Sequence, residues 1–273
     1  KHMSNIVKNN SQRVIKITNI RTNKYTIIYT ENCTIDFYLS NKSISCGKNQ
    51  FIFIDKGTFF SASLRKFDKR KEPYTAIRFN SDKLRILRQL IVVLYFKDNQ
   101  KINYTTISND KILTIASTNE LVFFFKRLSI TNDEIITLIN SLLFISNFKN
   151  RDHIIHSIIA SSICHFSDKV RALIETNLNR KWSVQDMAKF FHLSESATRK
   201  RLAKEKTSLK KIILQTRLNS SIELIIENEL QISQISSEVG VSSTSYFIKK
   251  FKEYFGITPK KLRDYFVTQK NIS

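Results

Sequence analysis

The last third of the chain contains one sequence pattern twice. The first copy, Ser183–Lys204, has the sequence SVQDMAKFFHLSESATRKRLAK, and the second, Gln231–Glu253, has QISQISSEVGVSSTSYFIKKFKE. Up to a turn the copies are offset by 48 residues, so that His192 matches Gly240, and the second copy then has one extra residue. In each copy apolar residues at helical spacing precede the turn, and a second helix with Ser, Lys or Arg follows it. This pattern predicts two helix-turn-helix motifs, whose second helices can enter a DNA major groove.

The two turn positions support this prediction. Gly240 suits a left-handed turn, and His192 is tolerated there because His is enriched at positive φ. A helix over Leu209–Glu227 is predicted to connect the motifs. Ser183 and Asp186 have the spacing of a capping box, while Ser167 and Asp168 are predicted to cap an earlier helix.

The ending Phe255–Arg263 completes a pattern that resembles the AraC/XylS family of bacterial transcription regulators. The resemblance covers residues 167–267, and Leu262 replaces the aromatic residue of the family ending G-x-S/T-P-x-x-Y/F-R. Leu262 can still fill an apolar position. The chain keeps four residues of that ending: Gly256, Thr258, Pro259 and Arg263.

The stretches FSDKVRALIE and NIRTNKYTIIYTENCTID extend the resemblance over nearly the whole chain, to the enteric virulence activators of this family. It implies an α+β fold. Residues 4–165 would form a jelly-roll-like β domain with dimerisation helices, after three residues typical of a tag remnant. Residues 166–273 would form an all-α domain with two helix-turn-helix motifs. The implied partners are double-stranded DNA, RNA polymerase and a second copy of the chain.

The N-terminal half has its own pattern, which agrees with this implication. Short β-branched and aromatic runs separated by polar clusters predict strands, as in a small barrel or sandwich. From Ser81 onward the period changes to helical, with helices over Asp133–Phe148 and His153–His165 and one containing Leu84 and Ile91. Their apolar stripes indicate core packing, and Asp133–Phe148 is the best candidate for a dimer face. The predicted strands are Thr26–Thr30, Cys33–Leu39, Gln50–Asp55 and Thr75–Phe79.

The charge and cysteine content limit the partners and the compartment. The 273 residues carry 45 basic and 23 acidic side chains, a net charge of +22, which predicts attraction to a polyanion. Both halves are basic, so charge alone does not say which half binds it. Three cysteines without repeated spacing favour reduced thiols in a cytoplasmic protein. We expect no membrane partner, since every apolar run is far shorter than the roughly 20 residues of a span.

Helix geometry selects the candidate DNA-reading residues. If Thr198 and Leu202 point inward on one helix, and Phe247 and Phe251 on the other, the remaining faces are exposed. Matching to the family's base-contacting face gives Ser196, Arg199, Lys200, Thr244, Ser245 and Lys249 as base readers. Each lysine could instead be a solvated surface charge. Phosphate contacts are predicted for Lys181, Lys250, Lys252, Thr258 and Lys260.

The resemblance also implies an effector site in the β domain, which would hold a fatty acid or bicarbonate. The family positions fall on Asn23, Lys24 and Arg78. Arg78 lies in an apolar strand, where a buried guanidinium needs an anionic partner, either an effector or a carboxylate of the protein. Asn23 and Ile226 stand where two relatives have His and Lys, which leaves a small anion open as an alternative to a fatty acid.

The sequence gives little support to an enzyme. The predicted strands contain no His, which excludes a cupin-type metal site, and no paired nucleophile and base, Gly-rich loop or Cys-x-x-Cys is present. We therefore predict neither a catalytic residue, a metal site nor a resident cofactor. The prediction is a cytoplasmic activator of virulence or colonisation genes that binds AT-rich promoters. The alternative is an effector-independent, DNA-occupying anti-silencer or interaction protein.

Overall fold

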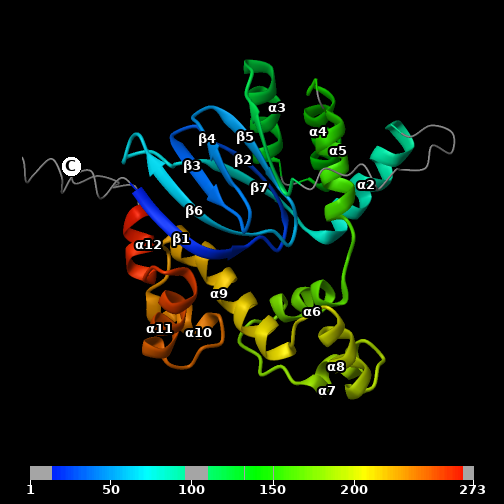
Figure 1. The fold of residues 1–273 in the computed structure, drawn as a ribbon, viewed down its shortest axis with the longest axis vertical. Helices are drawn as coiled ribbons and strands as arrows, with labels where there is room; N and C mark the ends of the chain where they lie inside the picture. The colour runs from blue at the N-terminus through cyan, green and yellow to red at the C-terminus, as the bar shows by residue number, and fades with distance from the viewer. Residues whose placement is uncertain (1–13, 96–109, 132, 150, 267–273) are drawn as a thin grey trace, which may run out of the picture. The chain divides into compact units, whose positions relative to one another are not determined.

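The computed structural model describes residues 14–95, 110–131, 133–149 and 151–266 (Figure 1). These residues fall into two compact units. One contains residues 21–163 with residue 14, and the other contains residues 164–266 with residues 15–20.

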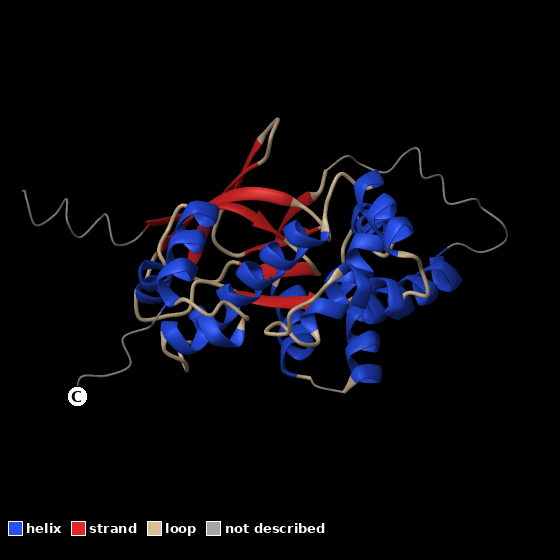
Figure 2. Ribbon diagram, turned by 90° about the horizontal axis from the view of Figure 1, so that it is seen from below, coloured by secondary structure: helices blue, strands red, loops and turns tan. Residues whose placement is uncertain are grey.

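Eight strands form two four-stranded sheets in the part of the chain that the structure describes (Figures 1 and 2). The strand order is β1-β6-β3-β4 in one sheet and β7-β2-β5-β8 in the other. The paired registers described for β2 through β8 are all antiparallel. The strands are β1 (Val14–Arg21), β2 (Tyr25–Tyr29), β3 (Cys33–Tyr38), β4 (Ser43–Cys46), β5 (Gln50–Ile54), β6 (Phe59–Lys66), β7 (Thr75–Phe79) and β8 (Ile112–Ala116).

The four strands predicted from sequence correspond to β2, β3, β5 and β7. Along β3 the buried side chains alternate with half-buried or exposed ones, as expected for a strand with one face in the core. Strands β2 and β5 are almost entirely buried because both of their faces are covered. Strands β1, β4, β6 and β8 were not predicted; β4 has only four residues, and polar residues interrupt the apolar ones in β1 and β6.

Helices pack against one sheet of the first unit: α2 (Ser81–Tyr95), α3 (Asn119–Ile130), α4 (Glu134–Ser146) and α5 (Arg151–Ser161). Aromatic rings dominate this core. The ring of Phe144 lies 5.2 Å from that of Phe51 and 5.0 Å from that of Phe148. Such tilted and edge-on pairs are favourable beyond the area that they bury. The helix predicted over Asp133–Phe148 is therefore α4, with Asp133 as its N-cap.

The described residues from 164 onward form helices and connecting loops only. This confirms the predicted α+β arrangement of a β-rich region followed by a helical one. The helices are α6 (Phe166–Glu175), α7 (Val184–Phe190), α8 (Glu195–Lys204), α9 (Leu209–Glu227), α10 (Ile232–Glu238), α11 (Thr244–Phe255) and α12 (Pro259–Phe266). The bounds predicted for the connecting helix are those of α9.

Two predicted boundaries are wrong. Helix α5 ends at Ser161 and not at His165, and His165 is the N-cap of α6. Ser167 lies inside α6, while the Asp168 carboxylate accepts a hydrogen bond from the His165 backbone N–H at 3.2 Å. The apolar run across this boundary hid the turn between the two helices.

Candidate DNA-binding surface

The first helix-turn-helix motif consists of α7, a turn at His192 and α8. Ser183 and Asp186 form the predicted capping box at the start of α7, with the Asp186 N–H donating to Ser183 Oγ at 3.1 Å. His192 has φ +53°, in the left-handed region. Ser194 then caps α8 by accepting from the Ala197 N–H at 3.1 Å. These local signals explain why the chain turns sharply here and begins a new helix.

The orientation of α8 follows from its buried residues. Thr198 and Leu202 have exposed fractions of 0% and 2%, and the second packs in a cluster with Met187 and Ile212. The predicted inward face is thus confirmed. The opposite face is exposed and contains the predicted readers Ser196, Arg199 and Lys200.

Arg199 has a partner on its own helix. Its guanidinium donates to the Glu195 carboxylate at 2.8 Å, and both side chains are exposed. The i, i+4 spacing of this pair is visible in the sequence and favours such a pair on a helix surface. A free Arg199 for guanine recognition requires this exposed and weakly held pair to open.

The second motif consists of α10, a turn at Gly240 and α11. Phe247, Phe251 and Phe255 are all buried, and the ring of Phe251 lies 5.7 and 4.7 Å from the other two. The predicted inward face of α11 is therefore confirmed. Ser245, Lys249 and Lys252 are exposed, and Thr244 is half-buried in the first turn.

The predicted phosphate-binding residues differ in their surroundings. Lys181, Lys252 and Lys260 are exposed. Lys250 donates to the Glu253 carboxylate at 2.8 Å, and this pairing raises the pKa of Lys250 and lowers that of Glu253. Thr258 Oγ1 caps α12 by accepting from the Lys261 N–H at 3.2 Å, and the Leu262 N–H donates to the Thr258 carbonyl at 3.1 Å.

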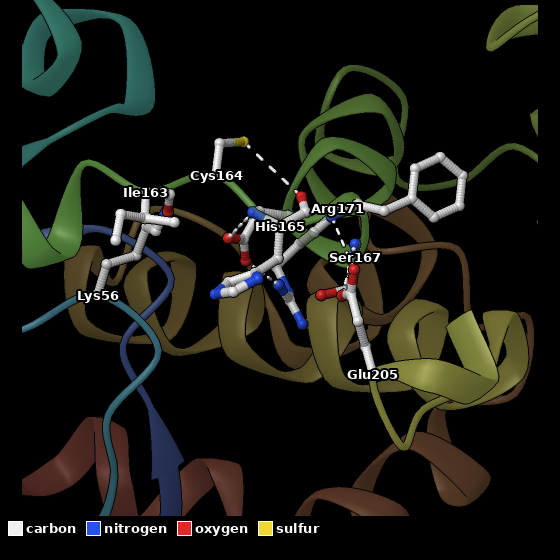
Figure 3. A network of polar contacts seen from close by, with 9 residues as sticks. Lys56, Ile163, Cys164, His165, Ser167, Arg171 and Glu205 are labelled. Carbon is white, nitrogen blue, oxygen red and sulfur yellow. Dashed lines mark hydrogen bonds and ion pairs between the residues drawn. The ribbon is translucent and has the colours of Figure 1, made fainter. Parts of the chain in front are cut away.

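Helices α6 and α8 are joined by one carboxylate. Glu205, the residue after α8, accepts hydrogen bonds from the backbone N–H groups of Phe166 and Ser167 at 2.9 and 3.0 Å (Figure 3). A carboxylate at a helix N-terminus satisfies free N–H groups and complements the helix dipole. This contact holds the end of α8 against the start of α6, a role that the sequence analysis missed.

Arg217, in the middle of α9, was also not among the predicted functional residues. Its guanidinium donates three hydrogen bonds, each 2.9 Å long, to backbone carbonyl oxygens. The signal in the sequence is a single arginine within α9, next to the buried Leu218 and one turn before the buried Ser221.

The three predicted effector residues lie near one end of the β2–β7 pair. Asn23 and Lys24 directly precede β2 and are half-buried, and Arg78 in β7 is opposite Thr26 of β2. Arg78 is exposed, so the argument from a buried guanidinium is wrong. It fails because β7 is an edge strand, and an edge leaves the end of a long side chain in solvent.

A small apolar cavity lies between the β7-β2-β5-β8 sheet and its helices. Tyr25, Ile27, Phe79 and Phe144 are among its lining residues, and it is too small to admit a water molecule. None of the three predicted effector residues lines it. An acyl chain would enter this core only by displacing side chains.

Over the described ranges, no group of three or more His, Cys, Asp or Glu side chains has an arrangement that could hold a metal ion. No helix within those same ranges has the length and apolar character needed to cross a membrane.

Two helix-turn-helix motifs joined by one helix define a class of DNA-binding proteins, and comparisons with known proteins agree. The profile of the helix-turn-helix domain family matches residues 187–265. The chain is 39% identical to the DNA-binding dual transcriptional regulator Rns of Escherichia coli, over 93% of this chain and 96% of Rns. It is 27% identical to the virulence regulon transcriptional activator VirF of Shigella flexneri, over 89% and 92% of the two chains.

The fold is similar to that of ToxT from Vibrio cholerae. An apo ToxT variant superposes with a TM-score of 0.67 and 16% identity, over 93% of both chains. The chain belongs to the AraC/XylS family of transcription regulators.

Proposed function

We propose that the protein is a cytoplasmic, sequence-specific DNA-binding activator of virulence or colonisation genes. The observation that carries this proposal is the pair of motifs whose second helices, α8 and α11, expose polar and basic faces. The names of the relatives Rns and VirF support it. The net charge of +22 supplies the attraction to DNA that precedes specific binding.

In the proposed complex, α8 and α11 enter adjacent major grooves about 34 Å apart on one face of the duplex. Base contacts come from Ser196, Arg199, Lys200, Thr244, Ser245 and Lys249. Phosphate contacts come from Lys181, Lys250, Lys252, Thr258 and Lys260. Most of these side chains are short or carry a single ammonium group, so they make few bidentate contacts to bases. The shape of AT-rich DNA therefore contributes to specificity.

The test begins with selection of bound duplexes from a random pool by the full chain. Lys249→Ala should then weaken binding to the selected duplex by about 1–3 kcal/mol while changing binding to random DNA little. Lys252→Ala, its matched control on the same helix, should weaken binding to all DNA alike and reduce the salt slope by about one. Equal losses on both duplexes for Lys249→Ala would remove it from the base readers. Failure to select any sequence would contradict the proposed function.

Activation further implies contact with RNA polymerase, and we propose that the active form is a homodimer. Helix α4 supports this, because Ile135, Ile139 and Leu143 lie one turn apart and are 69%, 52% and 42% exposed. A large exposed apolar patch marks an interaction surface. Ile139→Glu should shift the dimer to monomer in analytical ultracentrifugation, while Val93→Glu on α2 should not. An unchanged dimer in Ile139→Glu would exclude this face.

The proposed effector is a fatty acid or bicarbonate, bound near Asn23, Lys24 and Arg78, with no resident cofactor. The support is the cationic end of the β2–β7 pair and the fatty-acid-bound form of ToxT. DNA-binding titrations with decanoate and with bicarbonate should show a response that is lost in Arg78→Ala and kept in Arg65→Ala, an exposed arginine of β6. No response to either compound would favour the effector-independent, DNA-occupying anti-silencer.

A further inference from the structure

Three backbone carbonyl groups converge on one side chain of α9. Arg217 Nε donates to the Leu178 carbonyl, Nη2 to the Arg180 carbonyl and Nη1 to the Gly240 carbonyl, each at 2.9 Å. Leu178 and Arg180 lie in the segment that leads from α6 into the first motif. Gly240 is the turn residue of the second motif. One guanidinium therefore connects the entry of one motif to the turn of the other.

The chemistry of this contact requires arginine. A guanidinium presents five N–H donors in one rigid plane, so three acceptors that surround it are held at fixed angles to one another. A lysine ammonium keeps the charge but is a compact point donor on a flexible stem, and it cannot hold three separated carbonyl groups in that geometry. Arg217→Lys thus removes the geometry and leaves the charge.

The close approach at Gly240 is an independent observation of the same contact. A Cβ atom at Gly240 would lie 2.6 Å from the Leu178 carbonyl oxygen, 2.7 Å from Asn179 Cα and 2.8 Å from Arg217 Nη2. The equivalent turn of the first motif accepts a side chain, His192, at φ +53°. The left-handed conformation alone does not demand glycine at this position, whereas the approach of the 178–179 backbone does.

We infer that the contact among Arg217, Gly240 and Leu178 fixes the distance and rotation between the two motifs and thereby sets the half-site spacing that the protein accepts on DNA. The inference rests on the proposed function. Each inserted base pair moves one half-site by about 3.4 Å and rotates it by about 35° relative to the other. A rigidly connected pair of motifs cannot follow this change without losing the base contacts of one motif.

The experiment uses the full chain and the duplex that it selects from a random pool. Affinity is measured for this duplex and for versions with one base pair inserted or deleted between the half-sites. The wild-type protein should bind the altered versions about 10- to 100-fold more weakly, the effect of one or two mismatched base pairs. Arg217→Lys should reduce this ratio to about threefold or less.

Arg263→Lys is the matched control, because Arg263 Nη2 also donates to a backbone carbonyl, that of Leu230 at 2.6 Å, but does not join the two motifs. It should keep the wild-type ratio. Gly240→Asn is the second variant, since Asn tolerates positive φ and still adds the obstructing Cβ. Its counterpart His192→Asn should keep the ratio. If Arg217→Lys fails to fold, Gly240→Asn and its control His192→Asn still allow the affinity ratio to be measured.

The outcomes separate the possible explanations. General destabilisation of the fold lowers the affinity for all three spacings together and leaves their ratio unchanged. Full spacing discrimination in correctly folded Arg217→Lys or Gly240→Asn would overturn the inference while the proposed function stands. If the wild-type protein selects no sequence from the pool, the proposed function fails and the inference fails with it.

Discussion

Each helix-turn-helix motif has two helices joined by a turn with a residue at positive φ, but the residue at the turn differs between them. His192 and Gly240 both have positive φ, at +53° and +80°. Around Gly240 the backbone at residues 178–179 leaves no room for a Cβ atom, and Arg217 donates to its carbonyl. The difference teaches that a local conformation permits several residues, and that a tertiary contact then selects one of them.

The cores and caps of the motifs differ as well. The first motif packs Met187 and Leu202 with other buried aliphatic side chains, whereas the second packs buried phenylalanine rings, tilted against one another, along α11. A carboxylate, that of Asp186, completes the capping box of α7. The corresponding acceptor at α10 is the Gln234 amide, which receives the Gln231 N–H at 2.8 Å. The motifs should therefore respond differently to core truncation, to steric change at the turn and to acid.

The largest expected effect is truncation of the aromatic core. Phe251→Ala should lower the free energy of unfolding by about 3–5 kcal/mol, because it leaves a cavity between two rings. Leu202→Ala in the first motif should cost about 2–3 kcal/mol. Urea unfolding followed by circular dichroism measures both. Tyr246→Ala, at a 50% exposed position of α11, is the control. A loss as large for Tyr246→Ala as for Phe251→Ala would contradict the assignment of the core.

The next effect concerns the turns. Gly240→Ala should destabilise the protein by about 2–4 kcal/mol, the sum of left-handed strain and a steric clash. His192→Gly should change stability by only about 1 kcal/mol, because relief of strain offsets the added freedom of the unfolded chain. Thermal unfolding of the two variants measures the difference. Similar shifts for both would show that the turns are equivalent after all.

A smaller effect is expected from the cap that joins α8 to α6. Glu205→Gln should cost about 1 kcal/mol, because an amide replaces a charged acceptor at a helix N-terminus. The single tryptophan, Trp182, lies beside this motif and its fluorescence reports the transition. Glu238→Gln, an exposed change in α10, should have no effect. An equal shift for the two variants would argue against the cap.

The smallest effect is the pH dependence that the capping box of the first motif contributes. Hydrogen bonds from the Ser183 side chain and backbone, followed by the Arg180 guanidinium, hold the pKa of Asp186 below its ordinary value. A carboxyl with a lowered pKa in the folded state stabilises it above the unfolded pKa, near 4, and this contribution disappears as pH falls through the folded value. Below pH ~4, the free energy of unfolding should change less with pH in Asp186→Asn than in Asp264→Asn. Parallel pH curves for the two variants would exclude this contribution.

Much of the fold could be predicted because its signals are local. The repeat at helical spacing located both motifs and α9, and alternation located β3. The inward positions Thr198, Leu202, Phe247 and Phe251 follow from helix geometry once one of them is assigned to the core. Four strands were missed. Strand β4 has only four residues, and polar residues interrupt the apolar ones in β1 and β6.

The candidate site could be predicted in part. The exposed faces of α8 and α11 are those expected. The predicted burial of Arg78 was wrong, because the apolar pattern of a strand does not show whether the strand lies at the edge of its sheet. The roles of the named residues on DNA and with an effector remain predictions.

The sequence by itself determined the two motifs, their connecting helix and the exposed residues on each second helix, since period and capping act within a few residues. Only the tertiary structure decided why Gly240 must be glycine, which carbonyl groups Arg217 holds and where Glu205 binds. These contacts join residues 23 to 39 positions apart, and such approaches depend on packing that no local pattern encodes.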